Sequence, residues 1–279
     1  MAASHALPHE LPLGHLSTTV ARVAYHGLLG RPDGRVLGSH TLYACVASPL
    51  LLSLDGEAGT ANASVAHAPV AAHTVWVPPQ VPHRIAGASE LATVLCVMVE
   101  PESVDPSALA WPAGAPPGDA DAWLARVVQV CAALDAQPDG QALDDATLDT
   151  LLFGTDLPAR ALDARIASVA ARMALAPADV VDAADAARCC GLSVSRFLHL
   201  FKAELGVSWR AFRAWKRARS LLPCVRSGDN LTHIAQALGY PDASHFSHTI
   251  RQVTGFRPSE IMAGARLVRV MSDEDKGRR

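Results

Sequence analysis

Two similar stretches decide the fold of this chain: GLSVSRFLHLFKAELGVSWRAF at residues 191–212 and LTHIAQALGYPDASHFSHTIRQVTGFRPSEI at residues 231–261. An Ala-x3-Gly pattern occurs twice with an offset of 48, at Ala187 and Gly191 and then at Ala235 and Gly239. After a one-residue insertion the offset becomes 49, and the matched positions are Phe197 with Phe246, Phe201 with Ile250, Lys202 with Arg251, Gly206 with Gly255, and Phe212 with Ile261. This repeat indicates two tandem copies of one helical unit.

Each copy has the pattern of a helix-turn-helix. The small alanine lets the first helix approach the second closely, and the glycine permits the positive φ of a tight turn. Ser193 and Asp242 are predicted to cap the N-termini of the two second helices. We therefore predict the two units at about residues 179–206 and 230–255.

The second helix of each unit carries polar side chains opposite its apolar stripe. They are Ser195, Arg196 and His199 in the first copy, and Ser244, His245, Ser247 and His248 in the second. Such side chains can hydrogen-bond base edges or phosphates in a major groove. The joining segment, residues 208–225, is predicted as a long helix. Its expected basic surface consists of Arg210, Arg213, Lys216, Arg217 and Arg219.

Charge is distributed unevenly along the chain, whose formal net charge is −3. Residues 1–156 contain 5 Lys and Arg against 16 Asp and Glu, a net of −11. Residues 157–279 contain 19 against 11, a net of +8. This split favours contact between the second part and a polyanion. A plain helical bundle with solvated basic helices is the alternative, and two patterns in register argue against it.

The residue pattern before the repeat changes twice, from strand-like to linker-like and then to helical. From about residue 21 to 100, short runs of Val, Leu, Ile and Thr alternate with Gly, Asp or Pro, which is typical of an all-β sandwich or barrel. A Pro/Gly/Ala-rich stretch at 101–119 indicates a linker, and helical periodicity follows at about 120–135 and 141–153. An apolar face of these helices either serves dimerisation or packs back onto the β domain.

The ends and the cysteines point to a cytoplasmic chain. The first 20 residues, interrupted by Pro8, Pro12 and Gly14, are expected to form a loose leader without a signal peptide. No run of about 18 uncharged apolar residues occurs, so no membrane span is expected. The six cysteines form no CxxC pair, which disfavours a structural zinc site.

On the motifs quoted above, about residues 160–265 closely resemble the AraC/XylS family of transcription regulators. In that family two helix-turn-helix units flank a linker helix and bind adjacent major grooves, so the resemblance implies double-stranded DNA as the partner. By position it implies base or backbone contacts at Ser195, Arg196, His199, Ala243, Ser244, His245, Ser247 and His248, and phosphate contacts at Arg251 and Arg257. The sequence departs from the family pattern within residues 245–250 and 216–219.

The N-terminal part resembles the cupin-like sensor domains of the same family, at SLDGE (53–57), WVPPQVPHRI (76–85) and VLCVMVEPES (94–103). Enzymatic cupins hold a metal with several histidines and a glutamate. Here His40, His67, His73 and His83 are scattered and no HxH pair occurs, which favours a metal-free effector pocket. Its expected lining is His40, Tyr43, Trp76 and His83, and ordinary packing is the alternative for each.

The expected fold class is multi-domain α+β: an N-terminal cupin-like β barrel, central helices and a C-terminal all-α double helix-turn-helix. The expected boundaries are a leader (1–20), a sensor domain (21–105), a linker with helices (106–157), a DNA-binding domain (158–268) and a tail (269–279). The expected function is a sequence-specific regulator, not an enzyme, without a cofactor and controlled by a small-molecule effector. A homodimer is expected, with RNA polymerase as a partner of an activator. A metal-dependent cupin enzyme and a nonspecific DNA-binding protein are the alternatives.

Overall fold

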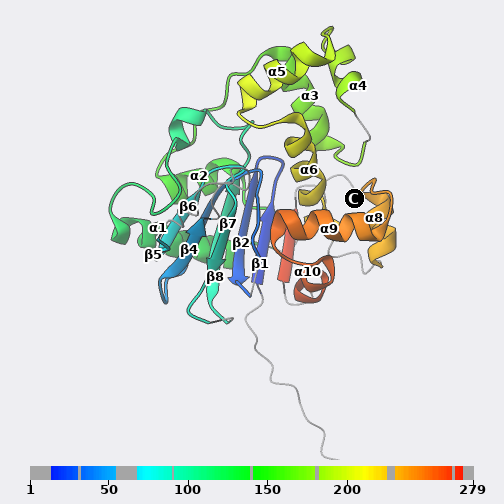
Figure 1. Cartoon of the computed structure of the whole chain (residues 1–279). Coiled ribbons are helices and arrows are strands. Elements are labelled where there is room, and N and C mark those ends of the chain that lie inside the picture. Colours follow the sequence, from blue (N-terminus) through cyan, green and yellow to red (C-terminus); the bar gives the residue numbers. More distant parts are fainter. Residues whose placement is uncertain are drawn as a thin grey trace, which may run out of the picture.

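Strands from the N-terminal region form two sheets in this computed structural model (Figure 1). The structure describes residues 14–30, 33–54, 68–89, 91–138, 141–179, 182–224, 230–265 and 268–272. The strands are β1 (Gly14–Thr18), β2 (Arg22–Leu28), β3 (His40–Ala44), β4 (Leu50–Leu54), β5 (Val70–Ala72), β6 (Thr74–Val77), β7 (His83–Ala86), β8 (Thr93–Val99) and β9 (Val268–Ser272). The larger sheet has the order β6-β3-β8-β2-β1-β9, and the smaller one the order β5-β4-β7. The described strands are thus arranged as two sheets, not as one closed barrel.

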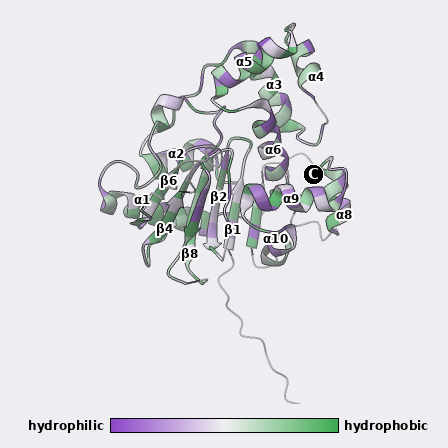
Figure 2. Ribbon diagram, viewed as in Figure 1, coloured by the Kyte–Doolittle hydropathy of each residue, from purple (hydrophilic) through white to green (hydrophobic). Residues whose placement is uncertain are grey.

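The larger sheet is buried on both faces because its strands are apolar at successive positions. On one face Leu42 and Trp76 pack against the central helices, and on the other Tyr43 and Val75 face the smaller sheet. Successive side chains of a strand point to opposite faces, so neighbours along β3 belong to different cores. Figure 2 shows hydrophobic residues in these strands with hydrophilic ones between them, as in β1 and β2.

The last strand, β9, is an edge strand of the larger sheet and lies next to the first strand, β1. It runs parallel to β1, with Gly14 opposite Val268 and Thr18 opposite Ser272. The boundaries expected from the sequence differ here, because the expected leader includes β1 and the expected tail includes most of β9. The chain therefore leaves the sheet for the helical part and returns to it.

Two central helices cover one face of the larger sheet. A 3-10 turn, η1 (Pro106–Leu109), precedes α1 (Ala120–Asp135) and α2 (Asp145–Phe153). The apolar side of α1 is buried in the core beneath it, at Trp123, Val127, Val130 and Leu134. Arg22 of β2 and Asp149 of α2 form a buried ion pair of 2.6 Å. The sequence left two alternatives for the apolar face of these helices, dimerisation and packing onto the β domain. In the structure this face packs onto the β domain.

The C-terminal part is helical, apart from β9. Its helices are α3 (Ala164–Leu175), α4 (Ala183–Cys189), α5 (Val194–Leu205), α6 (Trp209–Arg219), α7 (Leu221–Cys224), α8 (Leu231–Ala237), α9 (Ala243–Thr254) and α10 (Pro258–Ala265). Phe197, Phe201 and Phe212 belong to a separate core under α3, α4 and α5. Phe246 and Ile250 of α9 instead share a core with Tyr43 and Val75 of the sheets. Helix α9, in the second half of the helical part, therefore packs against the N-terminal region.

Candidate nucleic-acid interface

The first helix-turn-helix consists of α4 and α5. Ala187 is 1% exposed where the two helices meet, and Gly191 takes a φ of 64° in the turn between them. The Ser193 hydroxyl accepts a hydrogen bond of 3.4 Å from the Arg196 amide and so caps α5. The expected contact residues Ser195, Arg196 and His199 are all exposed on α5. The local rules of capping and turn formation thus present a polar helix face to solvent.

The second helix-turn-helix consists of α8 and α9 and repeats this geometry. Gly239 has a φ of 71°, and Asp242 caps α9 through a 2.7 Å hydrogen bond from the His245 amide. A Cβ atom at Gly239 would lie 2.5 Å from the carbonyl oxygen of Ala178, so this turn is closely packed. Of the expected contact residues on α9, Ser244, His245 and His248 are exposed, whereas Ala243 and Ser247 are half-buried.

Helix α6 joins the two units, and its basic residues do not form the expected free surface. Lys216 is 2% exposed and binds two carboxylates of the N-terminal region, Glu100 at 2.6 Å and Glu102. Arg219 Nη1 donates a 3.0 Å hydrogen bond to the carbonyl of Val20. Arg217 lies over the ring of Tyr240, 4.1 Å from its centroid. The expectation was wrong for Lys216 and Arg219 because they bind groups of the N-terminal region, and for Arg217 because it packs on Tyr240. Of the five basic residues only Arg210 is exposed.

Glu100 is the centre of a buried charge cluster between α6 and the sheet. Both of its carboxylate oxygens accept from the Trp215 indole, at 3.1 and 2.9 Å, and its Oε1 lies 3.0 Å from Arg219 Nε. Burial would raise the pKa of Glu100, but Lys216 and Arg219 outweigh it and hold that pKa below its usual value. Burial, followed by the neighbouring Glu100 charge, raises the pKa of Glu102.

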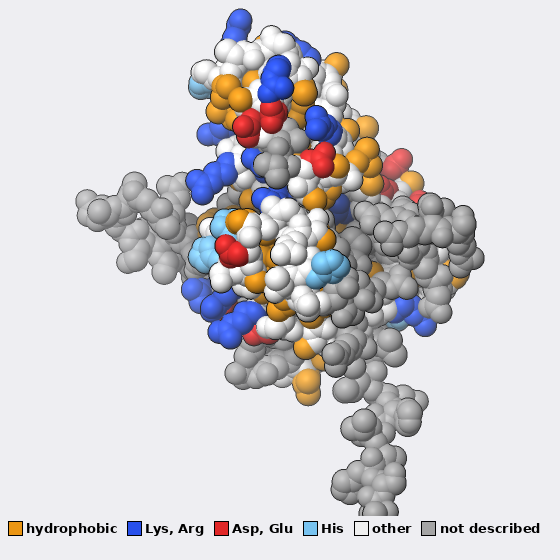
Figure 3. Space-filling view, turned by 90° about the vertical axis from the view of Figure 1, so that its right-hand side faces the viewer, with side chains coloured by type: hydrophobic (Ala, Val, Ile, Leu, Met, Phe, Trp, Pro, Cys, Tyr) orange, Lys and Arg blue, Asp and Glu red, His pale blue; other side chains and the backbone are white. Residues whose placement is uncertain are grey.

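The face that carries α8 and α9 is shown in Figure 3. Lys and Arg side chains extend from the top of the molecule down one flank of this view, with histidines between them and few carboxylates. Such a surface suits a phosphate backbone, since positively charged side chains release counterions from a duplex when they bind it.

Comparison with known proteins identifies the helical part. Residues 186–264 match the family described as "Helix-turn-helix domain". Over 86 residues the chain is 35% identical to the arabinose operon regulatory proteins of Salmonella typhimurium and Escherichia coli. The C-terminal part of this chain is an AraC-type helix-turn-helix domain. Over 72 residues it is also 35% identical to the invasion protein InvF of Salmonella typhi.

The matches to these curated relatives cover a minor part of both chains. The match covers 30% of this chain and 30% of the Salmonella arabinose regulator, and 25% of this chain and 33% of InvF. The chain therefore spans about a third or less of the length of the relatives it matches.

Solved structures extend the likeness to the whole fold. ToxT from Vibrio cholerae, solved at 1.65 Å resolution, has a TM-score of 0.55, and the match covers 88% of this chain and 98% of ToxT at 10% identity. A second structure, that of ToxT from Vibrio cholerae O395, gives a TM-score of 0.56 at 11% identity, with 88% and 98% covered. A sheet-rich N-terminal region followed by the AraC-type domain is thus a known arrangement.

The two arginines expected to bind phosphate differ in their surroundings. Arg257 is exposed in the loop before α10. Arg251, near the end of α9, instead donates from its Nε to Asp33 Oδ2 at 2.9 Å, while remaining half exposed. The hydrogen bond and charge of Arg251 hold the pKa of Asp33 below its usual value. Asp33, a carboxylate of the N-terminal region, therefore pairs with Arg251, an arginine of the AraC-type domain that was expected to bind phosphate.

The four residues expected to line an effector pocket do not form one. Tyr43 and His83 are hydrogen-bonded to each other at 3.0 Å between the two sheets. His40 and Trp76 stack on the opposite face of the larger sheet, with ring centroids 5.5 Å apart. Tyr43, Trp76 and His83 are 1% exposed or less. The expectation is corrected because the strand alternates its side chains, and all four serve packing.

Two of the histidines considered as metal ligands, His73 and His83, are held by backbone carbonyls. His73 Nδ1 lies 2.9 Å from the Cys45 carbonyl, and His83 Nδ1 lies 2.8 Å from the carbonyl two residues before it. His67 lies outside the described residues. In the described part of the chain, His40, His73 and His83 do not belong to a group of three metal-binding side chains. These three histidines are therefore not gathered into the metal centre that the alternative, a metal-dependent cupin enzyme, requires.

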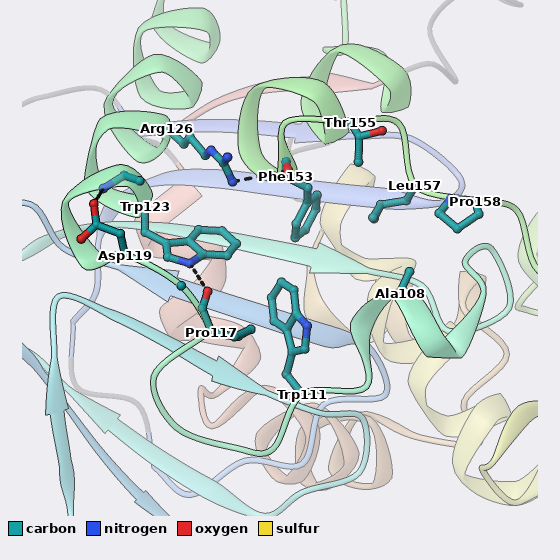
Figure 4. A pocket seen from close by; sticks show the side chains of 12 residues that line it. Ala108, Trp111, Pro117, Asp119, Trp123, Arg126, Phe153, Thr155, Leu157 and Pro158 are labelled. Atoms are coloured by element: carbon teal, nitrogen blue, oxygen red, sulfur yellow. Dashed lines mark hydrogen bonds between the residues drawn. The ribbon is translucent and has the colours of Figure 1, made fainter.

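A cavity of about 350 Å³ lies between α1, the end of α2 and the segment before α1 (Figure 4). Three aromatic rings border it, those of Trp111, Trp123 and Phe153, with centroids 5.7 to 6.2 Å apart. Arg126 points along the same wall, its guanidinium 5.8 Å from the Trp123 ring centroid, and donates to the Phe153 carbonyl at 3.4 Å. The sequence pointed to none of these residues, although two tryptophans flanking a Pro/Gly-rich stretch are a usable signal.

Proposed function

We propose that this chain is a sequence-specific DNA-binding transcription regulator. One observation carries the proposal: two capped helix-turn-helix units, in register along the chain, each present an exposed polar face on their second helix. A duplex offers adjacent major grooves to such a pair, and the short polar and basic side chains suit base edges and phosphates.

The contacts proposed for α5 are the more direct ones. Arg196 and His199 are exposed one turn apart on α5, so both can reach the same stretch of groove. On α9, Ser244, His245 and His248 take the corresponding role, whereas half-buried Ala243 and Ser247 allow close approach of the helix to DNA. Arg257 is proposed to bind phosphate, and Arg251 does so once it is released from Asp33.

The test is DNA selection with the full-length chain. The isolated C-terminal part is unsuitable, since Phe246 and Ile250 share a core with the sheets. The selected duplex should bind far more tightly than random DNA, with an affinity that falls steeply as salt rises. His199→Ala should relax preference at one base position at a cost of about 1–3 kcal/mol. Arg172→Ala, at an exposed position of α3, is the matched control and should keep the preference. Equal affinity for all duplexes would leave only a nonspecific DNA-binding protein.

The proposal includes control by a small molecule with an apolar body and a carboxylate. The cavity beside α1 has aromatic walls and one nearby guanidinium, a combination that suits such a ligand. Its volume is at the low end of the usual range of about 300–1,000 Å³, which favours a medium-chain or aromatic acid over a long-chain one. Support by analogy comes from ToxT of Vibrio cholerae in an unsaturated fatty acid-bound form, at a TM-score of 0.51 and 12% identity over 87% of this chain and 95% of that one.

Decanoate and decanol are a matched pair of probes for this cavity. Decanoate should quench or shift tryptophan fluorescence at lower concentration than decanol, because only the acid can pair with Arg126. Arg126→Gln should remove the difference between the two probes, while Arg165→Gln, at an exposed position of α3, should retain it. Equal responses to both probes in every variant would rule out a carboxylate site here.

The proposal also covers the protein partners of this chain, its location in the cell and whether it is an enzyme. An activator would contact RNA polymerase, and a homodimer would bind two half-sites; size-exclusion chromatography with light scattering tests the latter. The chain is proposed to act as a cytoplasmic regulator and not as an enzyme. In the described residues no helix is long and apolar enough to cross a membrane.

A further inference from the structure

Three side chains that can bind metal converge where β1 begins and β2 ends, beside the C-terminal end of α1. His15 of β1 and His26 of β2 are direct cross-strand partners, and Asp135 ends α1 above them. Asp135 Oδ1 lies 2.7 Å from His15 Nδ1 and 3.2 Å from His26 Nδ1. The three ligand atoms all lie within 4.8 Å of one another. This group is separate from the DNA-binding helices and from the cavity beside α1.

We propose that His15, His26 and Asp135 bind one divalent transition-metal ion, with Zn²⁺ as the best match. Two imidazoles and one carboxylate are a recurrent set of protein ligands for zinc, which water completes. Ligand atoms about 2.0–2.1 Å from one ion lie about 2.9–3.4 Å apart at angles between 90° and the tetrahedral value. The two nitrogen-to-oxygen distances are close to this range, and the two nitrogens, which lie within 4.8 Å of each other, are brought into it by rotation of the imidazoles.

The electrostatics of α1 support a cation at this place. Asp135 stands at the C-terminal end of the helix, where the helix dipole already concentrates negative charge, and the last turn holds no basic residue. A bound cation relieves this repulsion. The neighbouring Arg269 of β9, opposite His15 in the sheet, donates to the Gln137 carbonyl at 3.4 Å.

Access and rigidity also fit a metal site. The side chain of Asp135 is 50% exposed, whereas those of His15 and His26 are 12% and 23% exposed. The imidazoles are therefore held by the packed strands, and solvent reaches the ion from the carboxylate side. An ion here would join α1 to β1 and β2 by coordination bonds, and it would stabilise the native state in proportion to its affinity.

The experiment uses the full-length, untagged chain, stripped with a chelator and titrated with ZnCl₂. One equivalent should bind, and the melting temperature should rise with free Zn²⁺. Asp135→Asn and His26→Gln should each weaken binding by at least about tenfold and abolish the thermal shift. The control is the double variant His5→Gln/His9→Gln, because these upstream histidines could bind zinc without Asp135. Circular dichroism without metal, with Co²⁺ absorption as a second readout, separates loss of a ligand from loss of folding.

Two outcomes overturn the proposal. If the stripped chain binds no Zn²⁺ at micromolar concentration, the three residues form only a hydrogen-bonded carboxylate–histidine cluster. If Zn²⁺ binds equally well to folded Asp135→Asn, the ion lies elsewhere in the chain. Both results are independent of DNA binding, so they do not depend on the proposed function.

Discussion

His40 is a half-buried titratable side chain of β3 that forms no ion pair among the described residues. It stacks on Trp76, and its Nδ1 has no hydrogen-bond partner. Burial, with a smaller contribution from Arg160, lowers its pKa from 6.5 to about 4. In the folded chain the imidazole is therefore neutral at a pH where it is protonated after unfolding.

This difference predicts a pH dependence of stability. Because the folded pKa is the lower one, the unfolded chain binds more protons between pH 6.5 and about 4, and the free energy of unfolding should fall as the pH falls through that window. His40→Gln should flatten this part of the profile in urea titrations, relative to the wild type. His233→Gln, at an exposed position of α8, should leave the slope unchanged. An unaltered profile in His40→Gln would contradict the assignment.

The rules of helix capping and turn formation account for how well the repeat predicts the DNA-binding elements. Ser193 and Asp242 cap α5 and α9 as predicted, and α4, α5, α8 and α9 lie within the two predicted units. These features depend on residues a few positions apart. Long-range features escaped prediction: β9 is five residues long, and its partner β1 lies some 250 positions away.

Part of the failed site prediction was avoidable. His40 and Tyr43 are three residues apart in β3, an odd spacing that places them on opposite faces of a strand. The burial of Lys216 was harder to foresee, because a helix that is basic on one side looks the same whether that side faces water or carboxylates of another domain. Only the contact with Glu100 distinguishes the two.

The two turn glycines give a matched test at the level of elements. Both have a positive φ, but a Cβ at Gly191 would meet nothing within 4 Å, whereas one at Gly239 would meet the Ala178 carbonyl at 2.5 Å. Gly191→Ala should cost about 1–2 kcal/mol of unfolding free energy from backbone strain alone. Gly239→Ala should cost more, since the backbone must also move. Chemical denaturation measures both, and equal costs would argue against the close packing of the second turn.

At the scale of the whole molecule, the charge cluster of Glu100 joins α6 to the sheet. Removing one partner of a buried pair leaves an uncompensated charge, so Lys216→Met and Glu100→Gln should each destabilise the chain by about 3 kcal/mol. The loss of unfolding free energy in the double variant should be smaller than the sum of the losses in the two single variants, because Glu100 and Lys216 interact directly. Urea unfolding of the wild type, the two single variants and the double variant gives this double-mutant cycle. Asp163→Asn, which weakens a solvent-screened pair with Arg165, should lower the unfolding free energy far less than either change at Glu100 or Lys216. Additive costs for Glu100 and Lys216 would mean that their contact is not stabilising.

The Asp33 to Arg251 contact predicts an effect on DNA binding. Asp33→Asn frees Arg251 and removes a carboxylate beside α9, so affinity for the selected duplex should rise. The slope of log affinity against log salt should steepen by up to about 1, since one more phosphate contact forms. Fluorescence anisotropy at several salt concentrations measures both. Asp156→Asn, an exposed carboxylate elsewhere, is the control; an identical gain there would indicate a mere change in net charge.

The parallel pairing of β9 with β1 makes the AraC-type domain an insertion between strands of a single sheet. A domain linked by one flexible connection can explore almost any orientation, whereas one anchored at both of its ends is limited to rotation about the line that joins the anchors. Reorientation of the second helix-turn-helix is therefore restricted in direction as well as in range. Ending the chain before Val268 would remove one of the two anchors and so widen the range of directions, while the core that Phe246 and Ile250 share with the sheets would still hold the second unit.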